Sequence, residues 1–330
     1  MFQGVVQRIE NWTLFGRLVG VLVVASKSDT ASMTLYNAMM RLDGWSESFS
    51  SSLGDYYIHE CDRVYLLLID QIHIRADGID FIFKKNTSLP VNDVFILSKH
   101  VSSSNTPAMT LHAIGIPGIL PYGEEGRSGG KNGILVPPSK YFASLFRRMN
   151  KLAREGKLDA DFDLTLETTH HGPILKTPTL YIEIGSTDNE WSRDDVADCW
   201  AEVISDVLGM FGDELRYFNP NSEVMIGFGG GHYAPRHRAV IIDSEINLGH
   251  VIANYSLIFD QKSESQIPSG PWSECIKNVV ESTKISFPNN RIFAHLDRKS
   301  FKGWERSAII QRLDELGIEV RRGKQISQRE

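Results

Sequence analysis

The sequence predicts an α/β protein with three αβα layers, in which a mixed, largely parallel sheet lies between helices. Two observations carry this prediction. Apolar runs of strand length alternate with helix-like segments along the chain, as in sheets covered by helices on both faces. The chain has 330 residues, 42% of them hydrophobic, and can bury a large core as one domain or as two smaller ones. We expect one α/β domain over residues 18–330, after an N-terminal extension at 1–17.

The first elements follow from local patterning. The apolar run 19–25 predicts a strand, and the segment 31–42 predicts a helix that Ser28 or Asp29 could cap. Serine and glycine are frequent at 46–56, which predicts a loop, and the whole segment around 46–90 is poorly patterned, which predicts an irregular insertion. Further strands are expected at 64–69 and 93–97, the second ending at Ser98-Lys99-His100.

The later elements follow from the same signals. Residues 115–138 are rich in proline and glycine, and so long a connection is typical of a functional loop. The clearest helix is 139–155, where apolar residues recur at helical spacing between a cap at Ser139 and an end at Gly156. Strands are expected at 162–167, 179–184, 224–228, 291–296 and 318–320, and helices at 193–211, 271–286 and 303–316.

Charge and cysteine content narrow the class of protein. The net charge of −6 argues against a protein that coats nucleic acid non-specifically, so we expect no DNA partner. No apolar run approaches the roughly 20 residues of a membrane span. The three cysteines are far apart and form no C-x-x-C pair, which favours a reducing compartment. We therefore expect a cytoplasmic protein, and residues 1–17 leave an organellar address open.

Two glycine- and histidine-rich segments each follow a predicted strand. Gly229-Gly230-Gly231-His232-Tyr233-Ala234-Pro235-Arg236-His237 follows 224–228, and Thr168-Thr169-His170-His171-Gly172-Pro173 follows 162–167. Glycine lets the backbone turn sharply and approach a ligand closely. A dinucleotide loop is not expected, because the G-x-G-x-x-G spacing is missing and Pro235 argues against the helix that should follow. The two segments instead predict a polar site.

Five of the ten histidines share one context. His100, His171, His232, His250 and His295 each lie at or after an apolar strand-like run, and parallel strand ends converge on one edge of a sheet. Glu183 is a carboxylate within an apolar strand and must be paired, protonated or bound to a cation. Either an ion pair with a buried Arg or Lys, or a role as metal ligand or general base, would satisfy it. Because the cysteines are far apart, a thiolate zinc site is not expected, and a metal here would need histidine and carboxylate ligands.

Taken together, these blocks resemble the D-aminoacyl-tRNA deacylases of the archaeal and plant type, described as zinc-dependent. The resemblance covers roughly residues 19–310. Its blocks are Ser28–Ser32, Ser98–His100, Leu166–Pro173, Glu183–Thr187 with Trp191, Gly229–His237, Gly249-His250 with Tyr255–Leu257, and His295–Gly303. It implies a three-layer α/β fold related to phosphorylases and peptidyl-tRNA hydrolases.

The resemblance implies hydrolysis of the ester between a D-amino acid and tRNA, by a zinc-activated water. Catalytic candidates are His171, His232, His170 and Glu183. Metal-ligand candidates are His100, His171, His232, His295 and Asp297. Candidates for contact with the substrate or the tRNA acceptor end are Gly230, Gly231, Tyr233, Arg236, Lys299 and Lys302. We expect a monomer that binds tRNA locally, in a salt-sensitive way.

Three alternatives stay open at this point. Another zinc-dependent hydrolase, an aminopeptidase or amidase on the same fold, would use the same histidines. A non-enzymatic RNA-binding protein would bind tRNA without metal. An oxidoreductase is disfavoured because the dinucleotide fingerprint is missing.

Overall fold

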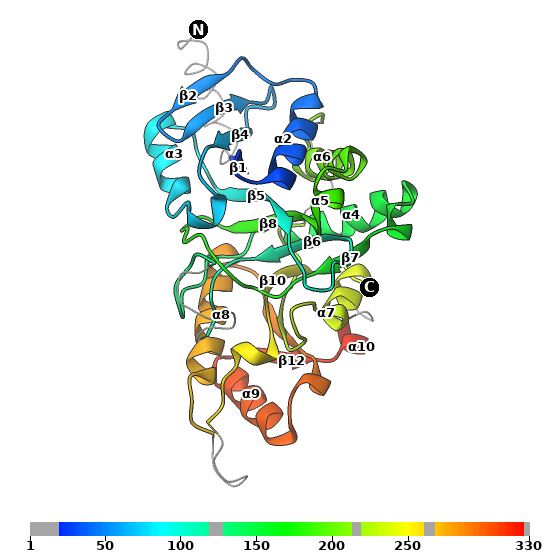
Figure 1. The fold of residues 1–330 in the computed structure, drawn as a ribbon. Helices are drawn as coiled ribbons and strands as arrows, with labels where there is room; N and C mark the ends of the chain where they lie inside the picture. Colours follow the sequence, from blue (N-terminus) through cyan, green and yellow to red (C-terminus); the bar gives the residue numbers. More distant parts are fainter. Residues whose placement is uncertain (1–19, 119–127, 213–218, 261–267, 327–330) are drawn as a thin grey trace.

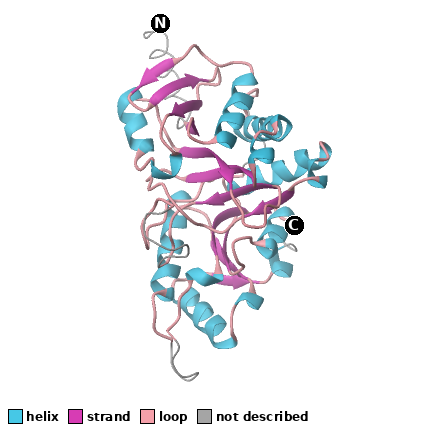
Figure 2. Ribbon diagram, viewed as in Figure 1, coloured by secondary structure: helices cyan, strands magenta, loops and turns pink. Residues whose placement is uncertain are grey.

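The computed structural model describes residues 20–118, 128–212, 219–260 and 268–326. The expected extension at 1–17 and part of the expected loop at 115–138 lie outside these residues. Twelve described strands form two sheets (Figures 1 and 2). The strands are β1 (Val21–Ser26), β2 (Phe49–Ser51), β3 (Gly54–Ile58), β4 (Val64–Ile69), β5 (Asp93–His100), β6 (Ala108–Ala113), β7 (Asp163–Leu166), β8 (Thr179–Gly185), β9 (Val224–Phe228), β10 (Asn247–Ile252), β11 (Ile292–Leu296) and β12 (Glu319–Arg321).

The longer helices cover both sheets. They are α2 (Thr30–Arg41), α3 (Ile79–Thr87), α4 (Phe142–Glu155), α6 (Asp194–Leu208), α7 (Pro235–Ile242), α8 (Trp272–Ser286) and α9 (Gly303–Glu315). Short helices are η1 (His73–Arg75), η2 (Leu158–Ala160), α5 (Asp188–Trp191), η3 (Asn254–Ser256), η4 (Arg298–Ser300) and α10 (Gly323–Ile326). In the described part of the chain, no helix is long and apolar enough to cross a membrane.

The eight-stranded sheet confirms the expected mixed, largely parallel arrangement. Its order is β2-β3-β4-β1-β5-β8-β6-β7. The neighbours β4, β1, β5 and β8 run parallel, whereas β6 runs antiparallel to β8 and parallel to β7. Helices α2, α4 and α6 pack on one face, and α3 packs on the other, so three layers form around this sheet.

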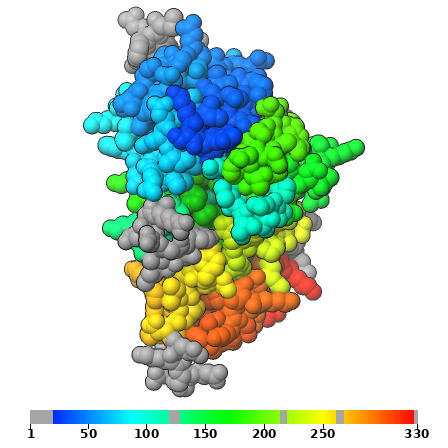
Figure 3. Space-filling model, in the orientation of Figure 1, coloured from blue at the N-terminus to red at the C-terminus, as the bar shows by residue number. Residues whose placement is uncertain are grey.

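The remaining four strands form a second, all-parallel sheet in the order β10-β9-β11-β12. One face packs on α8 and α9, and the other joins the core that contains α4 and α7. In the space-filling view this C-terminal part, yellow to red, lies below the blue, cyan and green part (Figure 3). A backbone bridge between Glu167 and Tyr233 joins the ends of the two sheets.

Most of the expected elements are found, with four differences. Residues 46–56, expected as a loop, form the hairpin β2–β3, whose cross-strand pairs include stacked Phe49 and Tyr56. Within 46–90, the regular elements β2–β4, η1 and α3 replace an irregular segment. Pro235 begins helix α7 rather than preventing one, because proline suits the first helical position. Strands β6 and β10 were not expected.

Two capping predictions can also be compared with the structure. Asp29 caps α2, since its carboxylate accepts a hydrogen bond from the Ser32 amide at 2.8 Å. Ser139 does not cap α4, which begins after Tyr141, although its hydroxyl accepts a hydrogen bond from the Tyr141 amide.

Candidate active site

The sheet register places polar side chains on one face at the end of β5. Ser98 of β5, Glu183 of β8 and Thr110 of β6 are in register, so their side chains share a face. Alternation then puts His100 and His112 on that same face. A central strand is normally apolar on both faces, so this polar group marks a site.

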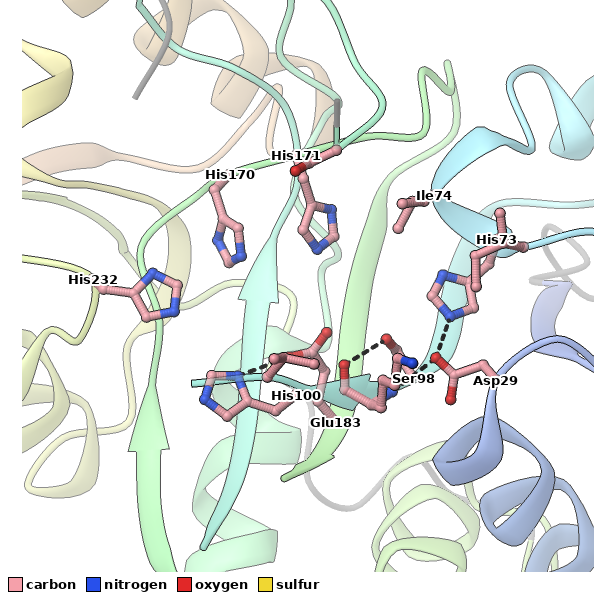
Figure 4. A pocket seen from close by; sticks show the side chains of 13 residues that line it. Asp29, His73, Ile74, Ser98, His100, His170, His171, Glu183 and His232 are labelled. Atoms are coloured by element: carbon pink, nitrogen blue, oxygen red, sulfur yellow. Dashed lines mark hydrogen bonds and ion pairs between the residues drawn. The ribbon is translucent and has the colours of Figure 1, made fainter. Parts of the chain in front are cut away.

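Two further segments complete the group. Strand β7 leads into Glu167, and the loop after it carries His170 and His171. The glycine loop after β9 delivers His232, and a hydrogen bond from the Thr168 amide to the His232 carbonyl holds the two segments together. Figure 4 shows His170, His171 and His232 facing His100 and Glu183.

The glycine loop uses its conformational freedom at two positions. Gly229 and Gly230 have φ values of 104° and 92°, in the region that side chains rarely adopt. Gly231 has an ordinary φ and open space around its Cβ position. The expected need for glycine therefore applies to the first two positions. His171 also has a positive φ, of 44°, an uncommon conformation for a residue with a side chain.

Glu167 is the centre of the cluster. Its carboxylate is 1% exposed and lies 2.9 Å from Nδ1 of His100, 3.0 Å from Nε2 of His232 and 3.6 Å from Nε2 of His170. Burial alone would raise its pKa. The hydrogen bonds and positive charge of the histidines outweigh burial and hold that pKa well below its usual range. Glu167 is therefore ionised.

Glu183 is the second carboxylate, and it is also ionised. It lies 3.4 Å from Nδ1 of His100 and 3.5 Å from Nε2 of His112. Although burial opposes ionisation, these two partners lower its pKa. The ion-pair alternative therefore applies in a modified form, because the partners are histidines and not Arg or Lys.

His100 carries the matching positive charge. Burial opposes its protonation, but hydrogen bonds to Glu167 and Glu183 outweigh burial and raise its pKa to about 11. Its Nε2 lies 2.8 Å from the Tyr233 hydroxyl, and its carbonyl accepts a hydrogen bond from the Trp191 indole. Both the ring and the backbone carbonyl of His100 are thus held in place.

Three histidines, His112, His170 and His171, have ring nitrogens close enough together to bind one metal ion. In His112, His170 and His171, Nδ1 lies 2.7–3.0 Å from a backbone carbonyl. A carbonyl only accepts, so each Nδ1 carries the proton and each Nε2 has its lone pair available when the ring is neutral. Backbone carbonyls commonly orient metal-ligating histidines in this way.

The donor set suits a zinc ion. The groups His112/His170/His171, His100/Glu167/His232 and His112/Glu167/Glu183 each bring three ligand atoms within 4.8 Å of one another. Both oxygens of Glu167 and Nε2 of His112 are buried without a hydrogen bond of good geometry. Burial lowers the pKa of His170, and it lowers that of His171 to about 3, so both rings are neutral near pH 7.

His112 completes the electrostatic balance of this cluster. Burial opposes its protonation, but Glu183 and Glu167 outweigh burial and raise its pKa. A positive charge is therefore favoured beside these carboxylates, whether it is a proton or a metal cation.

Most of the cluster lines a cavity of about 590 Å³, with Glu167 and His112 behind the lining residues. Asp29, Ser98 and His73 line its other end, where the His73 ring lies 3.2 Å from the Asp29 carboxylate (Figure 4). The same ring lies 3.1 Å from the Tyr181 hydroxyl. This volume is typical of small-molecule sites. Solvent reaches the cluster at His232, whose side chain is 31% exposed.

The structure brings together His100, His170, His171, Glu183 and His232, all of them sequence candidates. It does not bring in His295 or Asp297. Nδ1 of His295 lies 2.9 Å from Nδ1 of His237, and Asp297 pairs with Arg236 at 3.1 Å. His250, expected at the same edge, lies between the Thr169 and Ser282 hydroxyls, 3.0 Å from each.

The expected substrate contacts are divided between two places. Tyr233 contacts His100, whereas Gly230 bonds to Ser300 and Gly231 to Thr168. Lys299 and Lys302 line a separate cavity. Sequence reasoning placed none of His112, Glu167, Asp29 or His73 in the site, although Asp29 was expected as a possible helix cap.

The comparisons with known proteins agree with this geometry. A family model described as D-aminoacyl-tRNA deacylase matches residues 87–321. A D-aminoacyl-tRNA deacylase of Arabidopsis thaliana is 36% identical over 91% of this chain and 97% of its own length. One of Methanosarcina mazei is 30% identical over 93% of each. A crystal structure of a conserved protein of unknown function has the same fold, with a TM-score of 0.75, 24% identity and coverage of 95% and 99%.

Proposed function

The chain belongs to the D-aminoacyl-tRNA deacylase family, and from this premise we propose that it hydrolyses the ester between a D-amino acid and tRNA. The observation that supports the proposal best is the group of five histidines and two carboxylates, of which His100, His170, His171, His232 and Glu183 line one cavity. In the reaction, water adds to the ester carbonyl, the bond to the ribose oxygen breaks, and that oxygen takes a proton. The products are free D-amino acid and tRNA, so the enzyme would recycle mischarged tRNA.

We propose that the cluster holds zinc. His170 and His171 offer neutral Nε2 atoms, His112 offers an Nε2 atom once a cation takes the place of its proton, and Glu167 and Glu183 offer buried oxygens. A zinc ion bound there supplies polarisation of the ester carbonyl and a lowered pKa of water. The other two metal-ligand candidates from the sequence, His295 and Asp297, contact His237 and Arg236 instead, and are not needed to hold the zinc.

The remaining cluster residues position the reacting groups. His232 is the most exposed of them, and its Nε2 faces the ionised Glu167 at 3.0 Å. This pairing suits an imidazole that takes a proton from water and gives it to the departing ribose oxygen. His100 is fully paired and fixes the two carboxylates that surround it. Tyr233 in turn fixes His100.

We further propose that the protein acts as a monomer in the cytoplasm, with tRNA as its partner. The described cysteines Cys61, Cys199 and Cys275 are free thiols, which suits a reducing compartment. Light scattering after size-exclusion chromatography tests whether the protein is a monomer in solution.

The experiment that tests the proposal compares three variants for zinc content and D-Tyr-tRNA deacylation. His171→Ala should lose zinc and activity together. His232→Ala should keep zinc and lose at least about 100-fold in kcat, the typical contribution of an acid–base group. Asp297→Asn is the matched control for metal binding and should keep its zinc. Full deacylase activity in His171→Ala or His232→Ala would overturn the assignment.

A further inference from the structure

The four-stranded parallel sheet has a switch point of its own. The chain leaves β9 through α7 to β10 on one side, and leaves β11 through α9 to β12 on the other. The crevice between the carboxyl ends of β9 and β11 is therefore the place where open parallel sheets bind ligands. This crevice is separate from the histidine cluster, most of which lies on the eight-stranded sheet.

A cavity of about 410 Å³ lies at this edge. Its wall contains Asn254 and Phe259, which follow β10, and Lys299, Ser300 and Lys302, which follow β11. Two separate connections thus contribute to one cavity at the carboxyl ends of the strands. In Figure 3 the yellow residues near 250 and the orange residues near 300 lie side by side on the visible face.

The charge of this cavity is positive. Lys299 and Lys302 are exposed, and among the described residues neither has an ion-pair partner. Glu305 also lines the cavity, and its carboxylate accepts a hydrogen bond from the Lys302 amide at 2.7 Å, whereas nearby Asp297 pairs with Arg236. The lining therefore holds two ammonium groups and one carboxylate, a net positive charge. Two unpaired ammonium groups beside hydroxyl and amide side chains suit a phosphate group.

One wall of the cavity is aromatic and rigid. Phe259 stacks on Trp272 with ring centroids 5.0 Å apart, and Trp304 packs edge-on against Phe259 at 5.5 Å. A half-buried aromatic ring beside exposed lysines is a combination that proteins use to bind single-stranded nucleic acid. The cavity therefore suits a nucleotide better than an inorganic anion.

The cavity is connected to the active site through the glycine loop. The Gly230 amide donates to the Ser300 hydroxyl at 2.8 Å, and the Gly230 carbonyl accepts from the Asn254 amide at 3.0 Å. His232, two residues later, lies in the histidine cluster. The two cavities thus lie on either side of one short loop.

We propose that this second cavity binds a backbone phosphate in the single-stranded 3′ end of tRNA, while the terminal ester lies at the histidine cluster. The inference rests on the proposed function and deepens it by naming where the tRNA is held. Lys299 and Lys302 contact the phosphate, and Phe259 supports the adjoining base. The loop Gly229–Gly231 then lies between the reacting ester and the nucleotide upstream of it.

The test uses the double variant Lys299→Ala/Lys302→Ala in the full chain. Its control is Lys84→Ala/Lys85→Ala, which removes the same charge from the exposed end of α3. Two substrates are compared, D-Tyr-tRNA and 3′-(D-tyrosyl)adenosine, which has no upstream phosphate. The ratio of their kcat/KM values should fall roughly tenfold in the first variant, through KM, and stay constant in the control. The magnitude of the slope of log affinity for tRNA against log salt should fall by about 0.7, the value for one single-strand phosphate.

The outcomes separate this inference from the function on which it rests. Wild-type protein that leaves D-Tyr-tRNA intact would overturn the proposed function itself. If the wild-type protein is active and Lys299→Ala/Lys302→Ala changes neither the substrate ratio nor the salt slope, only the proposed role of the second cavity is overturned. Phe259→Leu gives an independent check, since loss of stacking should weaken competition by the trinucleotide CpCpA and leave competition by adenosine unchanged. Equal competition by CpCpA in the wild type and in Phe259→Leu would contradict the role of the ring.

Discussion

Replacing Glu167 by Gln should destabilise the metal-free protein by about 3 kcal/mol at pH 6. The imidazolium of His100 has a pKa of about 11, against 6.5 for a free histidine. At about 1.4 kcal/mol per pKa unit this corresponds to about 6 kcal/mol of stabilisation. This stabilisation comes from two carboxylates, Glu167 at 2.9 Å and Glu183 at 3.4 Å from Nδ1 of His100. Removing one charge therefore costs about half, near the lower end of the cost of breaking a buried ion pair.

The pH of the assay follows from the sign of the shift. Because the folded-state pKa of His100 is raised, its stabilisation is complete below pH 6.5 and is lost as the pH rises toward 11. Urea unfolding at pH 6 after dialysis against a chelator removes any stabilisation by bound metal. Glu155→Gln, at the exposed end of α4, is the control. A Glu167→Gln protein within about 0.5 kcal/mol of Glu155→Gln would refute this account of the cluster.

Three further predictions concern other parts of the molecule. Burial raises the pKa of Asp93 to about 7, so the stability that its protonated form contributes is lost as the pH rises from about 4 through 7. Between these pH values Asp93 should give the free energy of unfolding a slope of up to about 1.4 kcal/mol per pH unit. Asp93→Asn should remove that slope, measured by urea unfolding at a series of pH values. Thr169→Val removes the hydrogen bond to His250 and should lower kcat about tenfold with KM unchanged, because the loop beside it shifts. Arg321→Ala removes the bidentate partner of Glu223, which is 27% exposed and keeps its contact with Arg291 at 3.5 Å, and should cost about 1–3 kcal/mol in thermal or urea unfolding; an unchanged stability would contradict it.

Much of the fold could be predicted because its strands are apolar and its helices are amphipathic. Strands such as β5 and β8 and helix α4 follow directly from these patterns. The division into two sheets could not be predicted, since parallel strands of either sheet have the same composition. The hairpin β2–β3 was not expected because serine and glycine hide the alternation of Phe49, Tyr56 and their neighbours.

The candidate site was predicted in part, for a similar reason. His100, His171 and His232 follow predicted strands, so a rule about strand ends finds them. His112 lies inside β6, and the alternation of Thr110 and His112 in that apolar strand could have revealed it. Glu167 lies in the segment Leu166–Pro173, but a single acid at the end of a strand is not distinctive in sequence.

His295 was expected with the metal ligands because it also ends a strand. That strand, β11, belongs to the second sheet, where His237 of α7 contacts the His295 ring. Sequence order gives the position of a residue along its strand, whereas the sheet to which the strand belongs depends on tertiary packing.

The measurement that tests the central claim most directly is deacylation of matched D-Tyr-tRNA and L-Tyr-tRNA, with and without a chelator and with zinc added back. The account predicts rapid cleavage of the D ester alone, loss of that cleavage on chelation, and recovery with zinc. Equal cleavage of both esters, or full activity in protein shown to be free of zinc, would contradict it.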